Sequence, residues 1–192
     1  MSSVVRDSAD DARDLGTEGL QPATLACAIV FSGFAVYHAL TVAPGPRGLA
    51  VGCDLAVFVL CSAVYLICRR SRLTPGAFHL ITSALSVAIA SDSLLCGVLG
   101  VNPLFSHFDS LIVIGTVVVI PSPRWASAAI AIQLAGWAVV AWLVLPHDEV
   151  IPDVFVMASS VAVGFIIHAG RLRARRRILE LRAGDARREQ AL

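Results

Sequence analysis

The sequence predicts an all-α integral membrane protein: a bundle of six transmembrane helices followed by a basic helix on the cytoplasmic side. The first observation is composition, because 57% of the 192 residues are hydrophobic and only 15% are charged, whereas about a quarter of a soluble domain is charged. The second is that the apolar residues form blocks close to the roughly 20 residues that a helix needs to cross a bilayer. The third is that arginines gather in alternate connections between those blocks.

The chain divides into three parts. Residues 1–21 are rich in acidic residues and have no apolar periodicity, a composition typical of a disordered tail, which we expect on the cytoplasmic side. Residues 22–170 hold the apolar blocks and are the predicted transmembrane domain. Residues 171–192 are rich in arginine and are predicted to form a juxtamembrane signalling helix with partial coiled-coil character.

Turns rich in proline and glycine separate the predicted spans. The spans are residues 23–42, 49–68, 77–100, 104–120, 125–145 and 154–169. The fourth is the shortest, because polar residues occupy its start and its uninterrupted apolar part is only 111–120.

The distribution of arginine supports six crossings. Cytoplasmic loops of membrane proteins are enriched in Lys and Arg. With six spans, both termini and the connections around residues 69–72 and 124 lie on one side, and that side holds every arginine except Arg47. If the fourth block did not cross, the arginines of 69–72 and those of the C-terminal tail would lie on opposite sides. We therefore expect a multi-pass protein of the inner (plasma) membrane with both termini cytoplasmic.

Five ionisable residues fall at a similar depth in the outer third of the predicted bundle. They are His38, Asp54, Asp92, His107 and Asp109. Ionisable side chains within a membrane are costly and face the bundle interior, so each is a candidate functional residue. Together they fit a ligand pocket, a proton-sensing His–Asp pair or a metal site. The structural alternative is that each side chain finds a polar neighbour and fixes helix packing. Because no metal-binding motif occurs, we assign no metal.

Other polar and small residues are interpreted as packing features. Gln133 is expected to hydrogen-bond across helices, and His79 and His168 to lie at the inner ends of their spans. The pair Ser160 and Gly164, one helical turn apart, allows another helix to approach closely.

The last apolar block continues without a proline into the arginine-rich tail. The residues of this predicted output helix that we single out are Arg171, Leu172, Ile178, Leu179 and Leu181. Their aliphatic members form part of a heptad pattern, although Gly184 weakens it. We expect a basic helix with a partial seam for a partner helix and an attraction to anionic lipid headgroups.

No phosphate-binding loop, nucleophile elbow or metalloprotease motif occurs in the sequence. The segments outside the spans are also too short for a soluble catalytic domain. We therefore predict no catalytic residues and no cofactor, and no enzyme activity within these 192 residues.

Six spans without large loops, cytoplasmic termini and a closing arginine-rich helix over 171–188 resemble the membrane input region of bacterial multi-pass signalling enzymes. Membrane-anchored diguanylate cyclases with a GGDEF domain are one example of this architecture, and sensor histidine kinases and membrane adenylate cyclases are others. The resemblance implies a sensor or anchor region that passes a signal through its last span to a cytoplasmic output domain, which we expect outside this chain.

The resemblance also implies which partners the chain has. They are the lipid bilayer, a second copy of the chain in a homodimer, and the output domain; no nucleic acid is expected. Two alternatives remain open. One is a small transporter or channel, which predicts polar residues through the inner half of the bundle. The other is an intramembrane enzyme built on His38, Asp54 and Asp92.

Overall fold

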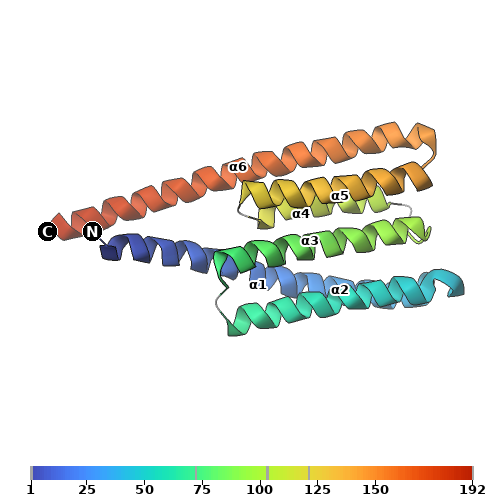
Figure 1. The fold of residues 1–192 in the computed structure, drawn as a ribbon, viewed down its shortest axis with the longest axis horizontal. Helices are drawn as coiled ribbons and strands as arrows, with labels where there is room; N and C mark the ends of the chain where they lie inside the picture. Colours follow the sequence, from blue (N-terminus) through green and yellow to red (C-terminus); the bar gives the residue numbers. More distant parts are fainter. Residues whose placement is uncertain (1, 72, 103, 121, 192) are drawn as a thin grey trace.

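The computed structural model is a bundle of long helices in which consecutive helices run antiparallel (Figure 1). It describes residues 2–71, 73–102, 104–120 and 122–191; for residues 2–19, 147–148 and parts of 175–191 it describes the backbone alone. Within these residues every regular element is a helix. The helices are α1 (Ser2–Thr41), α2 (Pro44–Arg70), α3 (Pro75–Val98), α4 (Phe105–Val119), α5 (Pro123–Val144) and α6 (His147–Ala191).

Three of the helices begin at a proline, two to five residues before the predicted spans begin. Pro44, Pro75 and Pro123 are the first residues of α2, α3 and α5. The first helical position needs no N–H donor, and the fixed φ of proline suits it. Proline therefore starts these helices, whereas the turn signals in the sequence predict it in the preceding turn.

Helix α1 differs from the predicted disordered tail. It begins at Ser2 and continues through Pro22 to Thr41, so residues 2–21 are helical. Extending an existing helix adds one hydrogen bond for each residue and avoids the cost of nucleation. A polar segment joined to a stable apolar helix can therefore be helical without an apolar face of its own.

Among the residues that the structure describes, five helices are long and apolar enough to cross a membrane. They comprise Leu20–Thr41, Pro44–Arg70, Pro75–Val98, Pro123–Val144 and Glu149–Ala174. The remaining apolar helix, α4, has 15 residues, which at 1.5 Å per residue is about 22 Å. That is less than the roughly 30 Å of a bilayer's hydrocarbon core. The fold is thus all-helical with multi-pass membrane character.

The distribution of side chains agrees with a bundle whose outer surface meets lipid. Large apolar side chains are exposed on all six helices, for example Leu40, Leu143 and Phe155, which are 78%, 71% and 74% exposed. Among the described side chains, the buried polar ones are Thr24, His38, Asp54, Thr82, Asp92, Ser93, Ser106, Asp109, Ser110, Thr116, Gln133, Ser160 and His168. A soluble bundle shows the opposite arrangement, with its polar face outward.

The helices form two packed groups that share α3. Helix α1 packs most extensively on α2, and α4 on α6. One apolar core contains Phe31, Val57 and Leu85 of α1, α2 and α3, and another contains Val113, Trp137 and Met157 of α4, α5 and α6. Helix α3 contacts both groups, through α2 on one side and through α4 and α5 on the other.

Both chain termini lie at the same end of the bundle (Figure 1). The α2–α3 and α4–α5 connections lie at this end as well, and the other three connections lie at the opposite end. The C-terminal part of α6 and the N-terminal part of α1 extend beyond the bundle in the same direction. Arg69, Arg70 and Arg124 are therefore at the end from which the arginine-rich tail projects.

Candidate binding cavity

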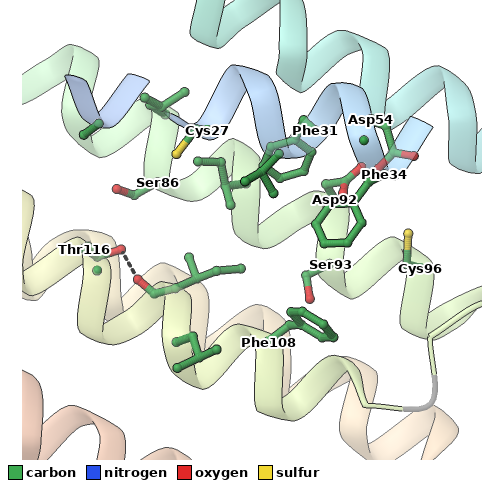
Figure 2. Close-up of a pocket in the computed structure, with 18 of the residues that line it drawn as sticks. Cys27, Phe31, Phe34, Asp54, Ser86, Asp92, Ser93, Cys96, Phe108 and Thr116 are labelled. Atoms are coloured by element: carbon green, nitrogen blue, oxygen red, sulfur yellow. Dashed lines mark hydrogen bonds between the residues drawn. The ribbon is translucent and has the colours of Figure 1, made fainter. Parts of the chain in front are cut away.

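A long cavity of about 980 Å³ lies between the two packed groups. Helices α1, α3 and α4 supply most of the lining residues, and α2 supplies Asp54. The lining residues on α1 extend from Leu20 to His38, a distance of about 27 Å along the helix axis. Most lining side chains are apolar, and the ionisable ones gather at the end far from the chain termini (Figure 2). We call this space the interhelical cavity.

Helix periodicity places His38 and Asp54 opposite each other. The buried residues of α1 recur at intervals of three and four from Ala28 through Ala35 and His38 to Val42, and those of α2 do the same from Ala50 through Asp54 to Val64. The two stripes face each other in the antiparallel α1–α2 hairpin. Nδ1 of His38 lies 2.6 Å from Oδ2 of Asp54, and the His38 and Asp54 side chains are 8% and 0% exposed.

Asp92 joins this pair from α3. Its carboxyl group interacts electrostatically with both Asp54 and His38, and all three residues line the interhelical cavity. Figure 2 shows Asp54 and Asp92 pointing toward the same region. The structure therefore brings three of the five predicted residues, from three different helices, into one polar cluster.

The hydroxyl groups elsewhere in the cavity are satisfied by backbone carbonyls. Thr24 donates to Leu20, Thr82 to Phe78, and Ser86 to the carbonyl of Thr82. Thr116 likewise donates to the carbonyl of Ile112, and Ser93 is 3.4 Å from the carbonyl of Phe105. Among the described lining residues, the buried polar atoms without a hydrogen-bond partner are Oδ1 of Asp54 and Oδ1 of Asp92.

Two aromatic rings bridge α1 and α4 beside the polar cluster. The Phe34 ring meets the Phe108 ring edge-on at a centroid distance of 6.2 Å and stacks on the His38 ring at 6.1 Å. Both phenylalanines line the cavity (Figure 2). We call this contact the Phe34–Phe108 bridge. Sequence reasoning did not identify it, because an apolar residue in a membrane helix carries no signal that separates cavity walls from lipid-facing positions.

The other two predicted residues lie outside the cluster. His107 is exposed, whereas Asp109 is 3% exposed with both carboxylate oxygens lacking a hydrogen-bond partner. Asp109 does not line the cavity. Residues two apart on a helix point in nearly opposite directions. Therefore His107 and Asp109 cannot both point into one site.

Helix α4 is fixed to α5 by side-chain hydrogen bonds. Gln133 donates to the Thr116 hydroxyl at 3.0 Å, which confirms the predicted role of Gln133 in joining helices. Trp137 donates from its indole nitrogen to the Ser106 hydroxyl, also at 3.0 Å. These bonds hold α4 at two points about ten residues apart along its length.

Helix α4 is fixed to α6 at Val117. A Cβ atom added at Gly164 would lie 3.0 Å from Cγ2 of Val117, so glycine allows α6 to approach α4 closely here. One turn later, Nδ1 of His168 lies 3.0 Å from the Val117 carbonyl oxygen. In a continuing helix that carbonyl would accept from the residue four positions later, but this residue is Pro121, which has no N–H. His168 supplies the missing donor.

The predicted output helix carries exposed side chains. Arg171 is exposed, Leu172 is partly buried, and Ile178 and Leu181 are 49% and 62% exposed. Leu179 lies outside the residues whose side chains the structure describes. The backbone of α6 runs through the whole segment from His147 to Ala191.

The described side chains include no group of three or more His, Cys, Asp or Glu arranged to hold a metal ion. No protein-family model, no curated protein and no solved structure matches this chain.

Proposed function

We propose that this chain is a six-span membrane sensor region that detects a ligand in the interhelical cavity and reports it through its C-terminal helix. The observation that carries the proposal is the position of α4. One face of α4 lines the cavity with Phe108, Ile112 and Thr116, and Val117 at its inner end contacts Gly164 and His168 of α6. A movement of α4 would therefore be transmitted directly to the helix that leaves the membrane.

The mechanism needs two arrangements of α4. A ligand that contacts Asp54 or Asp92 also meets the Phe34–Phe108 bridge, because Phe34 stacks on His38. Opening that bridge changes how α4 sits against α1, and α6 follows α4. Small movements of packed helices of this kind are a common form of signal transmission. The signal then reaches residues 171–192 on the cytoplasmic side, where a homodimeric output domain such as a diguanylate cyclase would receive it.

The cavity supports a sensor over a transporter or channel. A polar pathway would need free hydrogen-bonding groups along the inner half of the bundle. The hydroxyls of Thr24, Thr82 and Ser86 in that half donate to backbone carbonyls. Their hydrogens are therefore already used, and the neighbouring lining residues Leu20, Leu85 and Val119 are apolar.

A reporter fusion tests the proposal. A diguanylate cyclase catalytic domain is joined after Leu192, and cyclic di-GMP is measured in cells for Asp92→Asn and Phe108→Ala, each alone and combined with Gly164→Leu. We expect the cavity variants to change output several-fold, since coupled residues interact by about 0.5–3 kcal/mol. We expect Gly164→Leu to abolish that change, because the added side chain separates α6 from Val117.

Gly170→Leu is the matched control, because a Cβ atom at Gly170 meets no neighbouring atom within 4 Å. It lies on the same helix and should leave the response to the cavity variants intact. If the cavity variants change output equally in the Gly164→Leu and Gly170→Leu backgrounds, α4–α6 packing does not carry the signal. If no cavity variant changes output, the sensor proposal is wrong.

A further inference from the structure

We infer that the ligand of the interhelical cavity is a single-chain amphiphile with a hydrogen-bond-donating head group, and that it enters from the bilayer between α1 and α4. This inference names the ligand class for the site of the proposed function and rests on that proposal for its biological role. It concerns binding alone, so it is tested without an output domain.

The shape of the cavity indicates a ligand with one long apolar tail. The cavity follows α1 from Leu20 to His38, or about 27 Å, which is most of the thickness of a bilayer's hydrocarbon core. Its volume of about 980 Å³ is spread over that length, so the space is elongated. An extended apolar tail lying along α1 fills such a space.

The polar cluster selects the head group. Oδ1 of Asp54 and Oδ1 of Asp92 are buried carboxyl oxygens without a hydrogen-bond partner. The residues Asp54 and Asp92 are 0% and 8% exposed. An ionised carboxylate only accepts hydrogen bonds, and leaving a buried acceptor unsatisfied is costly. One histidine faces two carboxyl groups here. A hydroxyl or a protonated amine donates to these oxygens, whereas the carboxylate of a fatty acid brings only further acceptors.

The route of entry follows from exposure along the edges of the cavity. Val30 and Tyr37 of α1 and Leu111 of α4 line the cavity and are 51%, 57% and 65% exposed. The cavity therefore reaches the outer, apolar surface of the bundle between these two helices. The Phe34–Phe108 bridge crosses that edge next to the polar cluster. A lipid-like molecule already in the bilayer reaches the site without passing through water.

Photolabelling of the full chain in phosphatidylcholine vesicles tests this inference. Three probes carry the same saturated chain with a diazirine at its far end, and their head groups are an amine, an alcohol and a carboxylic acid. We expect the amine and the alcohol to label residues near the inner end of the cavity, such as Cys27 and Thr82, as mapped by mass spectrometry. We expect labelling by the acid to be about tenfold weaker, in line with the strength of a hydrogen bond to a charged group.

Two variants separate head-group recognition from cavity filling. Asp92→Asn should reduce labelling by the amine more than labelling by the alcohol, because it removes charge and keeps an acceptor oxygen. Gly115→Leu should abolish labelling by both, since Gly115 lines the cavity and a Cβ atom there meets no neighbouring atom within 4 Å. Gly52→Leu on α2 is the matched control, because Gly52 also has open space and lies outside the cavity.

Three results would overturn the inference: equal labelling by the acid and the amine, labels confined to residues outside the cavity, or labelling that Gly115→Leu leaves unchanged. Labelling that behaves as expected while the reporter fusion shows no coupling would leave the ligand class standing and refute only the sensor function. The two proposals therefore fail separately.

Discussion

A carboxylate held between membrane helices is stable only with a polar partner. Asp54 is fully buried, and its one hydrogen bond goes to Nδ1 of His38. Removing water from a carboxylate costs several kcal/mol, and a paired side chain offsets that cost. The second oxygen of Asp54 remains without a partner. His38 thus helps the α1–α2 hairpin to hold the buried side chain of Asp54. The second oxygen of Asp54 remains available to accept a hydrogen bond from a ligand.

Replacing His38 by alanine should destabilise the hairpin by about 1–3 kcal/mol, the cost of leaving a buried hydrogen-bonding group without its partner. The measurement is the labelling of Cys61 by a thiol reagent as denaturing detergent increases, in a chain whose other four cysteines are replaced by alanine. Cys61 suits this assay because it is fully buried in the same hairpin.

His107→Ala is the control for this experiment. His107 is exposed, and substitutions at exposed sites usually change stability by no more than about 0.5 kcal/mol. Equal effects of His38→Ala and His107→Ala would show that the His38–Asp54 contact does not stabilise the fold.

Helix α4 is the element on which the architecture depends. It is the shortest of the described helices, and it contacts α3, α5 and α6. Its contact with α3 depends on a glycine: a Cβ atom at Gly97 would lie 2.7 Å from Cγ of Phe105, whose side chain is 1% exposed. A short helix surrounded by others can sit within a bilayer thicker than its own length, because neighbouring helices rather than lipid satisfy its ends.

Gly97→Ala should therefore destabilise the chain, even though alanine favours a helix by up to about 1 kcal/mol relative to glycine. Overpacking of a tight contact typically costs about 1–3 kcal/mol, and the crowded atoms lie at the base of the Phe105 side chain. Equilibrium unfolding in mixed micelles, followed by tryptophan fluorescence, measures the difference.

Gly52→Ala is the matched substitution, because the Cβ position at Gly52 is open. It should be neutral or stabilising. Combining Gly97→Ala with Phe105→Leu should recover part of the loss. A stabilising effect of Gly97→Ala alone would contradict the close packing of α3 on α4.

At the scale of the whole molecule, the bundle places its two termini and two of its connections at one end (Figure 1). Arg69, Arg70 and Arg124 lie at that end, and Arg47 lies at the other (Figure 1). This arrangement agrees with the tendency of Lys and Arg to remain on the cytoplasmic side. The orientation in a membrane follows if α4 crosses like its neighbours.

Single cysteines in a cysteine-free chain test that orientation. Residues 71 and 122 lie in connections at the end that holds the termini, and residues 45 and 102 lie at the other end. In intact cells, a membrane-impermeant thiol reagent should label cysteines at 45 and 102, and those at 71 and 122 only after the membrane is opened. Labelling of position 122 in intact cells while position 71 stays protected would mean that α4 does not cross.

The sequence predicts some helices of the fold more accurately than others. Apolar blocks and proline-rich turns located all six apolar helices, because burial in lipid imposes a strong requirement on composition and length. Their starts were misplaced at Pro44, Pro75 and Pro123, since the same residue serves both a turn and a first helical position. The helical state of residues 2–21 was missed because it depends on continuation from α1 rather than on local composition.

For the candidate site, the sequence by itself determined which side chains are costly to bury and at what position along each helix they lie. It could not determine their direction around each helix, because lipid-facing and interior positions in this chain are equally apolar. Only the tertiary structure decided that His38, Asp54 and Asp92 converge while His107 points away. The same is true of the Phe34–Phe108 bridge and of the contact between His168 and Val117. Such pairings depend on which helices become neighbours, and long-range packing decides this.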